Sequence, residues 1–294
     1  MQLAPHISAA PKSGAASDSF RARHWRALPV LLGVLGLAFS ALQAFAPALI
    51  VPAALVLFLL GIPHGAVERD PLGALMRGRI RAPGLMYSGL YLVFGVLVFS
   101  SWLIAPWPTL LIALILSAWH FALTPGAPRG IGVFVVCACF ALWPDTTLSL
   151  FGALTGQALS VPTGALVAVG AIGFAALWLS PGWRHDWPMR LVLSGVFLVV
   201  HPVAAVAIYF FAAHSLAESA AMLDQRPDEP AWRSVLRIYG PTSLPALVGA
   251  TALLWLTWQS LVAVPLAAGL AVAFIVPHML PVERLLRVER AVGR

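Results

Sequence analysis

The chain has 294 residues, of which 60% are hydrophobic and only 10% are charged, and its mean hydropathy is +0.89. Soluble domains carry about 25% charged residues, so this composition excludes an ordinary soluble protein and predicts that hydrocarbon surrounds the chain. The formal net charge of +7 at pH 7 comes mostly from arginines between apolar runs and at both ends of the chain. That distribution is typical of contact with anionic lipid headgroups. No basic groove interleaved with aromatic residues is visible, so we expect no nucleic acid partner.

The first 26 residues are mostly small or polar and end in a basic cluster, Arg21, Arg23, His24 and Arg26. We interpret residues 1–26 as a disordered basic tail. The apolar run that follows is long enough to span a membrane, and no small-residue cleavage site closes it early. We therefore expect a retained first helix rather than a removed signal peptide.

Long apolar runs follow the tail, and they lack the alternation of barrel strands, which favours membrane-spanning helices. Their approximate ranges are 28–48, 50–66, 84–105, 107–124, 130–147, 161–180, 189–223, 243–261 and 262–281. Each run is close to the roughly 20 residues of a spanning helix, except 189–223, which is too long for one simple span. The sequence therefore predicts an all-α, polytopic membrane bundle over residues 27–281, followed by a basic cytoplasmic tail over residues 282–294.

The arginines also predict the topology, because cytoplasmic loops are enriched in positive charge. This rule places the N-terminal tail, the loop 67–83 and the C-terminal tail on the cytoplasmic side. Two ends on the same side require an even number of crossings. We therefore expect about eight transmembrane helices in the cell inner (plasma) membrane, with one candidate between 130 and 188 that fails to cross.

Four histidines fall at a similar depth in this topology, near the cytoplasmic ends of their spans: His64, His120, His214 and His278. Ionisable side chains inside a membrane are costly, and they are read as functional by default. The common depth favours a shared metal ion. Imidazole suits Fe, Cu, Zn and Ni, so the residue types leave the metal open.

Carboxylates accompany two of these histidines. Glu218 is the only carboxylate well inside a predicted span, and it follows His214 by four residues, so the two share a helix face. Such a pair supplies either two ligands to one metal or one ligand and its orienting partner. His64 and Glu68 repeat the spacing.

His201 is a weaker candidate. On a continuous helix it would lie about 20 Å from His214, too far to share a small site. We expect it to make a structural hydrogen bond unless Pro202 breaks the helix sharply.

Four segments, GIPHGAVE, SAWHF, HPVAAVAIYFFAAHSLAE and PHMLPVER, resemble in this order the Brp/Blh-type β-carotene 15,15′-dioxygenases. These are bacterial and archaeal integral membrane enzymes that supply retinal, often to rhodopsins. The resemblance runs from about residue 55 to 285. It implies cleavage of the central double bond of β-carotene with O2 at a non-haem Fe(II), with His64, His120 and His214 at metal-ligand positions.

The sequence departs from the family pattern near these positions. Glu218 stands where the family usually has a second histidine, Glu68 where Asp is usual, and Ala217 where Arg is usual. Mixed sets of histidine and carboxylate ligands suit O2-activating iron, so Glu218 can complete the metal site. His278 is the alternative fourth ligand.

The resemblance leads to the hypothesis of a membrane-embedded non-haem iron dioxygenase that converts β-carotene to retinal, with possible hand-off to a rhodopsin. The polyene would arrive from the bilayer through a slot flanked by Trp119, Phe121, Tyr209, Phe210 and Phe211. The alternative is a divergent, non-catalytic protein that binds or transports a carotenoid or another polyene.

Two other classes are less compatible with the sequence. The membrane di-iron desaturases need short histidine-rich boxes, and none is present. A haem-binding electron carrier would need two facing histidines, for which His64 and His120 are candidates.

Overall fold

The computed structural model describes residues 19–63, 83–124, 126–128, 130–224, 230, 232–233, 235–236, 240 and 243–279. All regular structure within these ranges is helical, as the sequence predicts. The helices in chain order are α1 (Phe20–Phe45), α2 (Ile50–Gly61), α5 (Pro83–Ile104), α6 (Pro106–Ala122), α7 (Ile131–Leu142), α8 (Pro144–Thr155), α9 (Thr163–Leu179), α10 (Trp183–Val199), α11 (Pro202–Ile208), α12 (Leu216–Asp224), α14 (Ser243–Trp258) and α15 (Val264–Met279). A 3-10 turn, η2 (Pro47–Leu49), precedes α2, and a π-helical segment, η3 (Tyr209–Ser215), joins α11 to α12.

Helix α1 begins earlier than the sequence predicts. Ser19 caps its N-terminus through its side chain. The carboxylate of Asp224 accepts hydrogen bonds from the backbone N–H groups of Phe20 (2.6 Å) and Arg21 (3.1 Å). The prediction of a disordered tail up to residue 26 is therefore wrong for its last part, because a distant carboxylate completes the cap and no local pattern reveals it.

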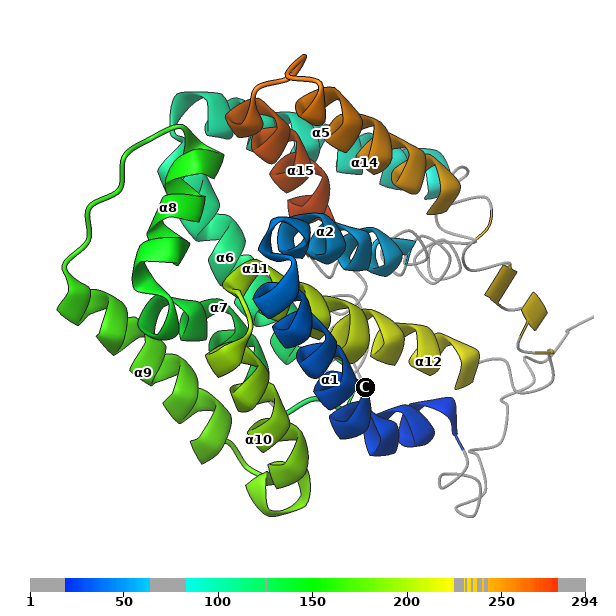
Figure 1. Ribbon diagram of the computed structural model, residues 1–294. Helices are drawn as coiled ribbons and strands as arrows, with labels where there is room; N and C mark the ends of the chain where they lie inside the picture. Colours follow the sequence, from blue (N-terminus) through cyan, green and yellow to red (C-terminus); the bar gives the residue numbers. More distant parts are fainter. Residues whose placement is uncertain are drawn as a thin grey trace, which may run out of the picture.

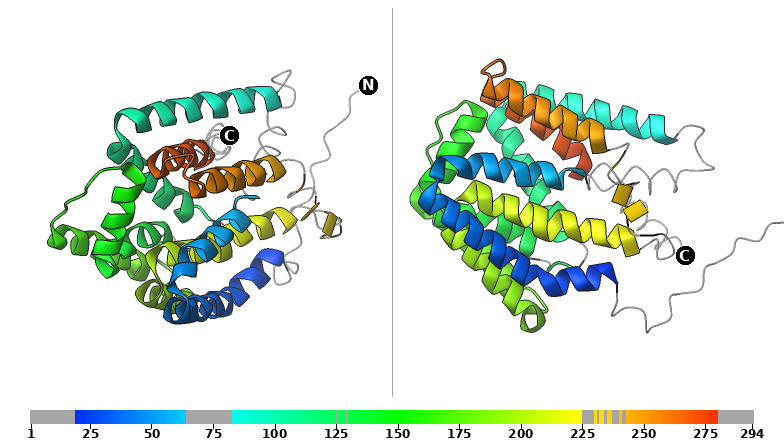
Figure 2. Two further views of the ribbon diagram at one scale, coloured as in Figure 1. Left: turned by 45° about the horizontal axis from the view of Figure 1, so that its top comes forward. Right: turned by 45° about the vertical axis from the view of Figure 1, so that its right-hand side comes forward.

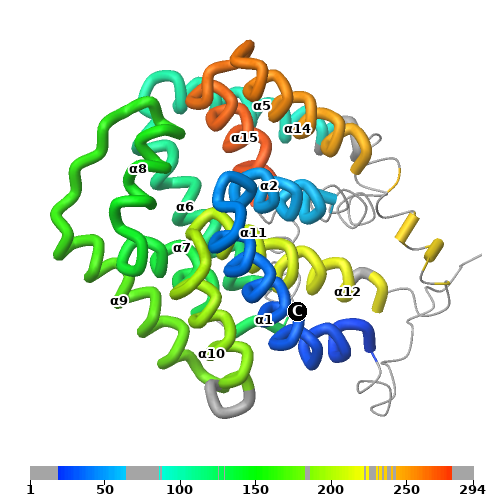
Figure 3. Tube along the Cα trace, in the orientation of Figure 1, coloured from blue at the N-terminus to red at the C-terminus, as the bar shows by residue number. Residues whose placement is uncertain are grey.

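The segment α11–η3–α12 forms the centre of the bundle, as Figure 1 and the right-hand view of Figure 2 show. Helix α1 packs along α12 on one side, and α2 packs against α11 and η3 on the other. Helix α6 approaches the same centre from behind, between α7 and α15 (Figure 3). This arrangement brings helices from both halves of the sequence together around η3.

The long apolar run 189–223 is divided into two helical stretches, α10 and the continuous stretch α11–η3–α12. Helix α10 ends at Val199, and α11 begins at Pro202. Between them, His201 adopts an extended conformation, and its backbone N–H donates to the side-chain oxygen of Gln43 (2.9 Å). The break at Pro202 explains why the run exceeds the length of one span.

By length and composition, two of the described helical stretches can cross a membrane: Phe20–Phe45 and Pro202–Ala221. A third is possible if Ile131–Leu142 and Pro144–Thr155 form one span, although they are bent by 108° at Trp143. Several of the other apolar helices have 10–17 residues. The bend lies within the stretch where one candidate was expected not to cross.

Helices α6 and α7 approach each other closely beside the last turn of α6. Gly132 makes this possible, because a Cβ at this position would collide with the Ala118 carbonyl and lie 2.8 Å from the Ala122 backbone nitrogen. These two groups flank the turn that carries His120. The small residue on α7 therefore fixes the position of that turn.

Arg190 on α10 forms hydrogen bonds with the C-terminal end of α9 and the residues that follow it. Its side chain is fully buried, and its guanidinium donates to the carbonyls of Leu177, Ser180 (3.3 Å) and Pro181 (3.3 Å). The carbonyls at a helix C-terminus lack partners within the helix. Asp186 approaches the same guanidinium at 3.6 Å.

We expect Arg190→Met to lower the free energy of unfolding by about 3 kcal/mol or more, since each hydrogen bond to a charged group contributes about 1.5–3 kcal/mol. Thermal unfolding in detergent measures this change. The matched control is Asp186→Asn, which weakens a partly exposed pair and should change stability by less than about 1 kcal/mol. Equal stability of both variants would contradict the assignment.

Candidate metal centre

Two of the predicted histidines face each other in the interior. His120 lies in the last turn of α6, and His214 lies in η3. Their Nε2 atoms are 3.1 Å apart, and the exposed fractions of the two residues are 7% and 0%. The imidazole rings of two histidines that are distant in sequence therefore meet in the buried interior.

Thr124 completes the polar contacts of His214. Its hydroxyl oxygen lies 2.7 Å from Nδ1 of His214, and the threonine is itself buried. Both ring nitrogens of His214 thus have a polar neighbour, as burial requires. Histidine ligands of metals are usually held in this way through the second ring nitrogen.

His278 joins the pair from α15. Its ring lies against the ring of His120, with centroids 4.9 Å apart and planes at 72°. The ring of His214 also lies against that of His120, with centroids 4.8 Å apart and planes at 70°. The structure therefore brings together three of the four histidines that the sequence places at one depth.

The π-helical segment η3 carries His214 and places its ring beside His120. A π-helical turn inserts one extra residue per turn, and such turns are frequent at functional sites. In η3 the backbone N–H of Leu216 bonds to the carbonyl of Phe211, five residues earlier. The side chains of Tyr209, Ala212, Ala213, His214 and Ser215 are all buried there.

Aromatic rings enclose the histidine pair. The ring of Phe121 lies edge-on to those of His214 (5.0 Å between centroids) and Tyr209 (5.1 Å). Phe210 also contacts the ring of His214, at 5.8 Å. Trp119, which the sequence analysis placed beside the slot, is 43% exposed instead, because it lies on the outer face of α6.

The hydroxyl of Tyr209 is a buried polar group at the same place. It lies near Thr124 and makes no hydrogen bond of good geometry within the described residues. A buried hydroxyl without such a bond carries a free-energy cost. The site therefore has spare hydrogen-bonding capacity beside the histidine pair.

The end of α2 is anchored next to His214. The hydroxyl of Ser215 donates to the carbonyl of Gly61 (3.0 Å), and that of Ser243 donates to the carbonyl of Pro63 (3.3 Å). His64 follows Pro63 directly in the chain, but it lies outside the described residues, as does Glu68. The first described range, 19–63, therefore ends one residue before His64 in the chain, and its Gly61 contacts the neighbour of His214.

Glu218 lies one helical turn beyond His214, in α12, and is partly buried. Within the described ranges, no group of three or more His, Cys, Asp or Glu side chains is arranged to hold a metal ion. A complete site needs at least one more ligand beside the pair His120 and His214.

The two nitrogens fit a metal ion as well as they fit a hydrogen bond. Metal–imidazole bonds of about 2.0–2.1 Å place neighbouring ligand atoms roughly 3 Å apart, which matches the Nε2 separation of 3.1 Å. Both rings are buried, so solvent does not separate the two nitrogens.

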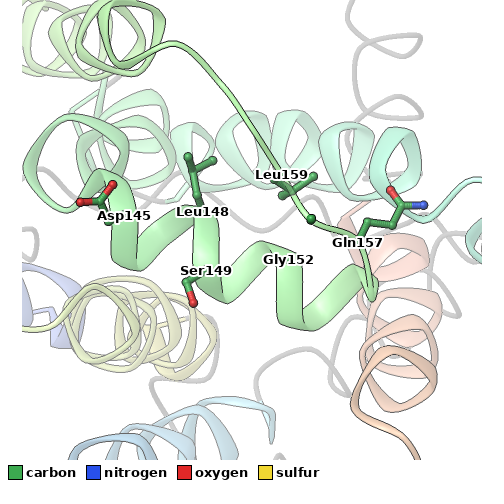
Figure 4. A pocket seen from close by; sticks show the side chains of 7 residues that line it. Asp145, Leu148, Ser149, Gly152, Gln157 and Leu159 are labelled. Carbon is green, nitrogen blue, oxygen red and sulfur yellow. The ribbon is translucent and has the colours of Figure 1, made fainter.

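Two pockets lie elsewhere. One, of about 460 Å³, is formed by α8 and the loop that follows it, between Asp145 and Leu159 (Figure 4). The other, of similar volume, lies on α14 between Leu247 and Trp255. Neither is lined by a predicted ligand, so neither is the expected slot for a polyene.

The fold and the cluster define a class: an all-helical, strongly apolar protein with buried, converging histidines. The protein family described as beta-carotene 15,15′-dioxygenase matches residues 55–286, and the chain belongs to this family. The resemblance seen in the four sequence segments is thereby confirmed. No curated protein and no solved structure showed a match to the chain.

Sequence reasoning missed Thr124. It lies beyond the end of α6, four residues after His120, in a segment that reads as a loop. The available signal was this spacing, which places a hydroxyl within one turn of a histidine at a helix end. A hydroxyl residue is common there for structural reasons alone, so the spacing carries little weight without the structure.

We expect Gly61→Ala to lower the free energy of unfolding by about 1–3 kcal/mol, the usual cost of overpacking. An added Cβ would collide with the ring of Phe210 and lie 2.8 Å from the hydroxyl of Ser215. Thermal unfolding in detergent measures the change. In the control variant Gly89→Ala, the added Cβ meets nothing within 4 Å. A Gly61→Ala protein as stable as the control would contradict the close contact.

Proposed function

We propose that the protein is a membrane-embedded non-haem iron dioxygenase that cleaves the central 15,15′ double bond of β-carotene to give retinal. The buried pair of His120 and His214, within the range matched by the family, is the observation that carries this proposal. The described helices with span-like length and composition support a membrane location. The proposal includes a multi-pass topology of about eight crossings in the inner (plasma) membrane.

The proposed reaction balances without an external reductant. The 15,15′ double bond of β-carotene breaks, and the O–O bond of O2 breaks. Each of the two carbon atoms receives one oxygen atom, and two molecules of retinal form.

Iron(II) would be held by His120 and His214 together with His64, which follows the anchored end of α2. When bound, the iron supplies the activation of O2. His278 or Glu218 would provide a fourth ligand. The contact of the His278 ring with His120 favours His278.

The aromatic residues around the pair serve the substrate. Phe121 and Phe210 exclude water from the histidines and present ring faces and edges to the flat polyene. An apolar C40 hydrocarbon dissolves in the bilayer, so we propose that it enters from lipid between helices. The retinal product is equally apolar, so it can pass within the membrane to an opsin.

The first test is expression of the chain in cells that accumulate β-carotene, with iron and O2 supplied. We expect loss of colour and the appearance of retinal in the extract, measured by chromatography. We expect His214→Ala and His64→Ala to abolish retinal production, because each removes a proposed ligand, while the protein remains folded.

The control for these variants is His201→Ala. The hydrogen bond that His201 makes to Gln43 uses its backbone N–H, which alanine retains, so retinal production should persist. Full activity of His214→Ala would reject the site. A folded wild-type protein that retains β-carotene without cleaving it would favour the alternative, a non-catalytic polyene-binding or transport protein.

The fourth ligand is tested by comparing His278→Gln with Glu218→Gln. We expect His278→Gln to cause the larger loss of iron in the purified protein, because the His278 ring already lies against His120. Metal analysis of equal amounts of folded protein measures the difference. A larger loss in Glu218→Gln would assign the fourth position to the carboxylate.

A further inference from the structure

We propose that Thr124 is a positioning residue that fixes the tautomer and orientation of His214 for metal binding. The inference rests on the proposed function of the histidine cluster and extends it to a residue that does not touch the metal. Its basis is the 2.7 Å contact between the Thr124 hydroxyl and Nδ1 of His214.

The backbone around Thr124 is held by a tight turn. Its N–H donates to the carbonyl of Phe121 (3.2 Å), and its carbonyl accepts from the N–H of Ala127 (3.0 Å). The residue is only 4% exposed, so water does not compete for its hydroxyl. The hydroxyl is therefore presented to His214 at a fixed place.

Two tautomers of His214 are compatible with this contact, and Thr124 is proposed to hold the first of them. A threonine hydroxyl can accept a hydrogen bond from Nδ1–H, or it can donate one to a bare Nδ1. In the first case, Nε2 of His214 has a lone pair directed towards Nε2 of His120, which lies 3.1 Å away. In the second case Nε2 carries a hydrogen, and the nitrogen cannot bind a metal.

Thr124 and His120 belong to one short stretch at the end of α6. Gly132 of α7 holds that stretch by a close backbone contact. One stretch of chain thus supplies a proposed ligand and the residue that orients the other ligand. The separation of the two histidines and the orientation of His214 are set by the same packing contact.

The experiment compares Thr124→Val, which keeps the shape but removes the hydroxyl, with Thr124→Ser, which keeps the hydroxyl. Two measurements are made on purified full-length protein. The first is the affinity for cobalt(II), followed by its visible ligand-field spectrum. The second is nitrogen-15 NMR of labelled histidines in the metal-free protein, in which the two tautomers differ in chemical shift. The His214 signals are identified by their absence in His214→Gln.

We expect the wild type and Thr124→Ser to hold His214 as the Nδ1–H tautomer and to bind cobalt(II) with similar affinity. We expect Thr124→Val to lose the tautomer preference and to bind cobalt(II) about 10–100-fold more weakly, the usual effect of removing the partner of a ligating histidine. Melting temperatures check that all variants are folded.

Two results would overturn the role of Thr124 alone: an unchanged cobalt(II) affinity in folded Thr124→Val, or an Nε2–H tautomer of His214 in the wild type. The second result needs no variant to fold. A folded wild type that binds no cobalt(II), or whose affinity is unaffected by His214→Gln, overturns the metal centre itself and the role of Thr124 with it. The two failures are therefore distinguishable.

Discussion

The structure depends on one constraint: imidazole nitrogens buried in an apolar interior must each have a polar partner, because burial without one is costly. His214 is fully buried, and it meets this constraint with Thr124 at Nδ1 and His120 at Nε2. Both partners come from the end of α6, almost a hundred residues earlier in the chain. The end of α6 must therefore lie next to η3, the π-helical segment that carries His214.

Small residues make this close approach possible. Gly132 lets α7 contact the backbone of α6 beside His120, and Gly61 lets the end of α2 contact Phe210 and Ser215 beside His214. Membrane-type helix packing relies on such small residues, since lipid provides no hydrophobic driving force between helices. At the centre, polar contacts replace part of that missing force. The contacts that pack the helices at the centre of the bundle are consequently also the contacts that position the histidines.

The sequence predicts much of this arrangement, and its limits are physical. Apolar runs and arginine positions predict helices and place His120, His214 and His278 at one depth, and the structure brings these three together. Proline acts locally, so the break at Pro202 could be considered from the sequence. The π-helical turn and the cap from Asp224 could not, because the runs carry no signal for a π-helical turn and the cap joins distant segments. Side-chain direction is equally hidden: Phe121 points inward while Trp119 is exposed. His64 lies outside the described residues, so its place in the cluster stays a prediction.

Glu218 would affect the charge balance of the proposed metal centre. A divalent ion held only by neutral imidazoles keeps its full charge in an apolar interior, which is costly. Glu218 lies one turn beyond His214 on the same helical stretch, and a carboxylate there would offset part of the charge of the proposed ion. This effect does not require direct coordination, since charge interactions are strong where the dielectric constant is low. If His278 takes the ligand position in the proposed metal centre, Glu218 would therefore serve as its counter-charge.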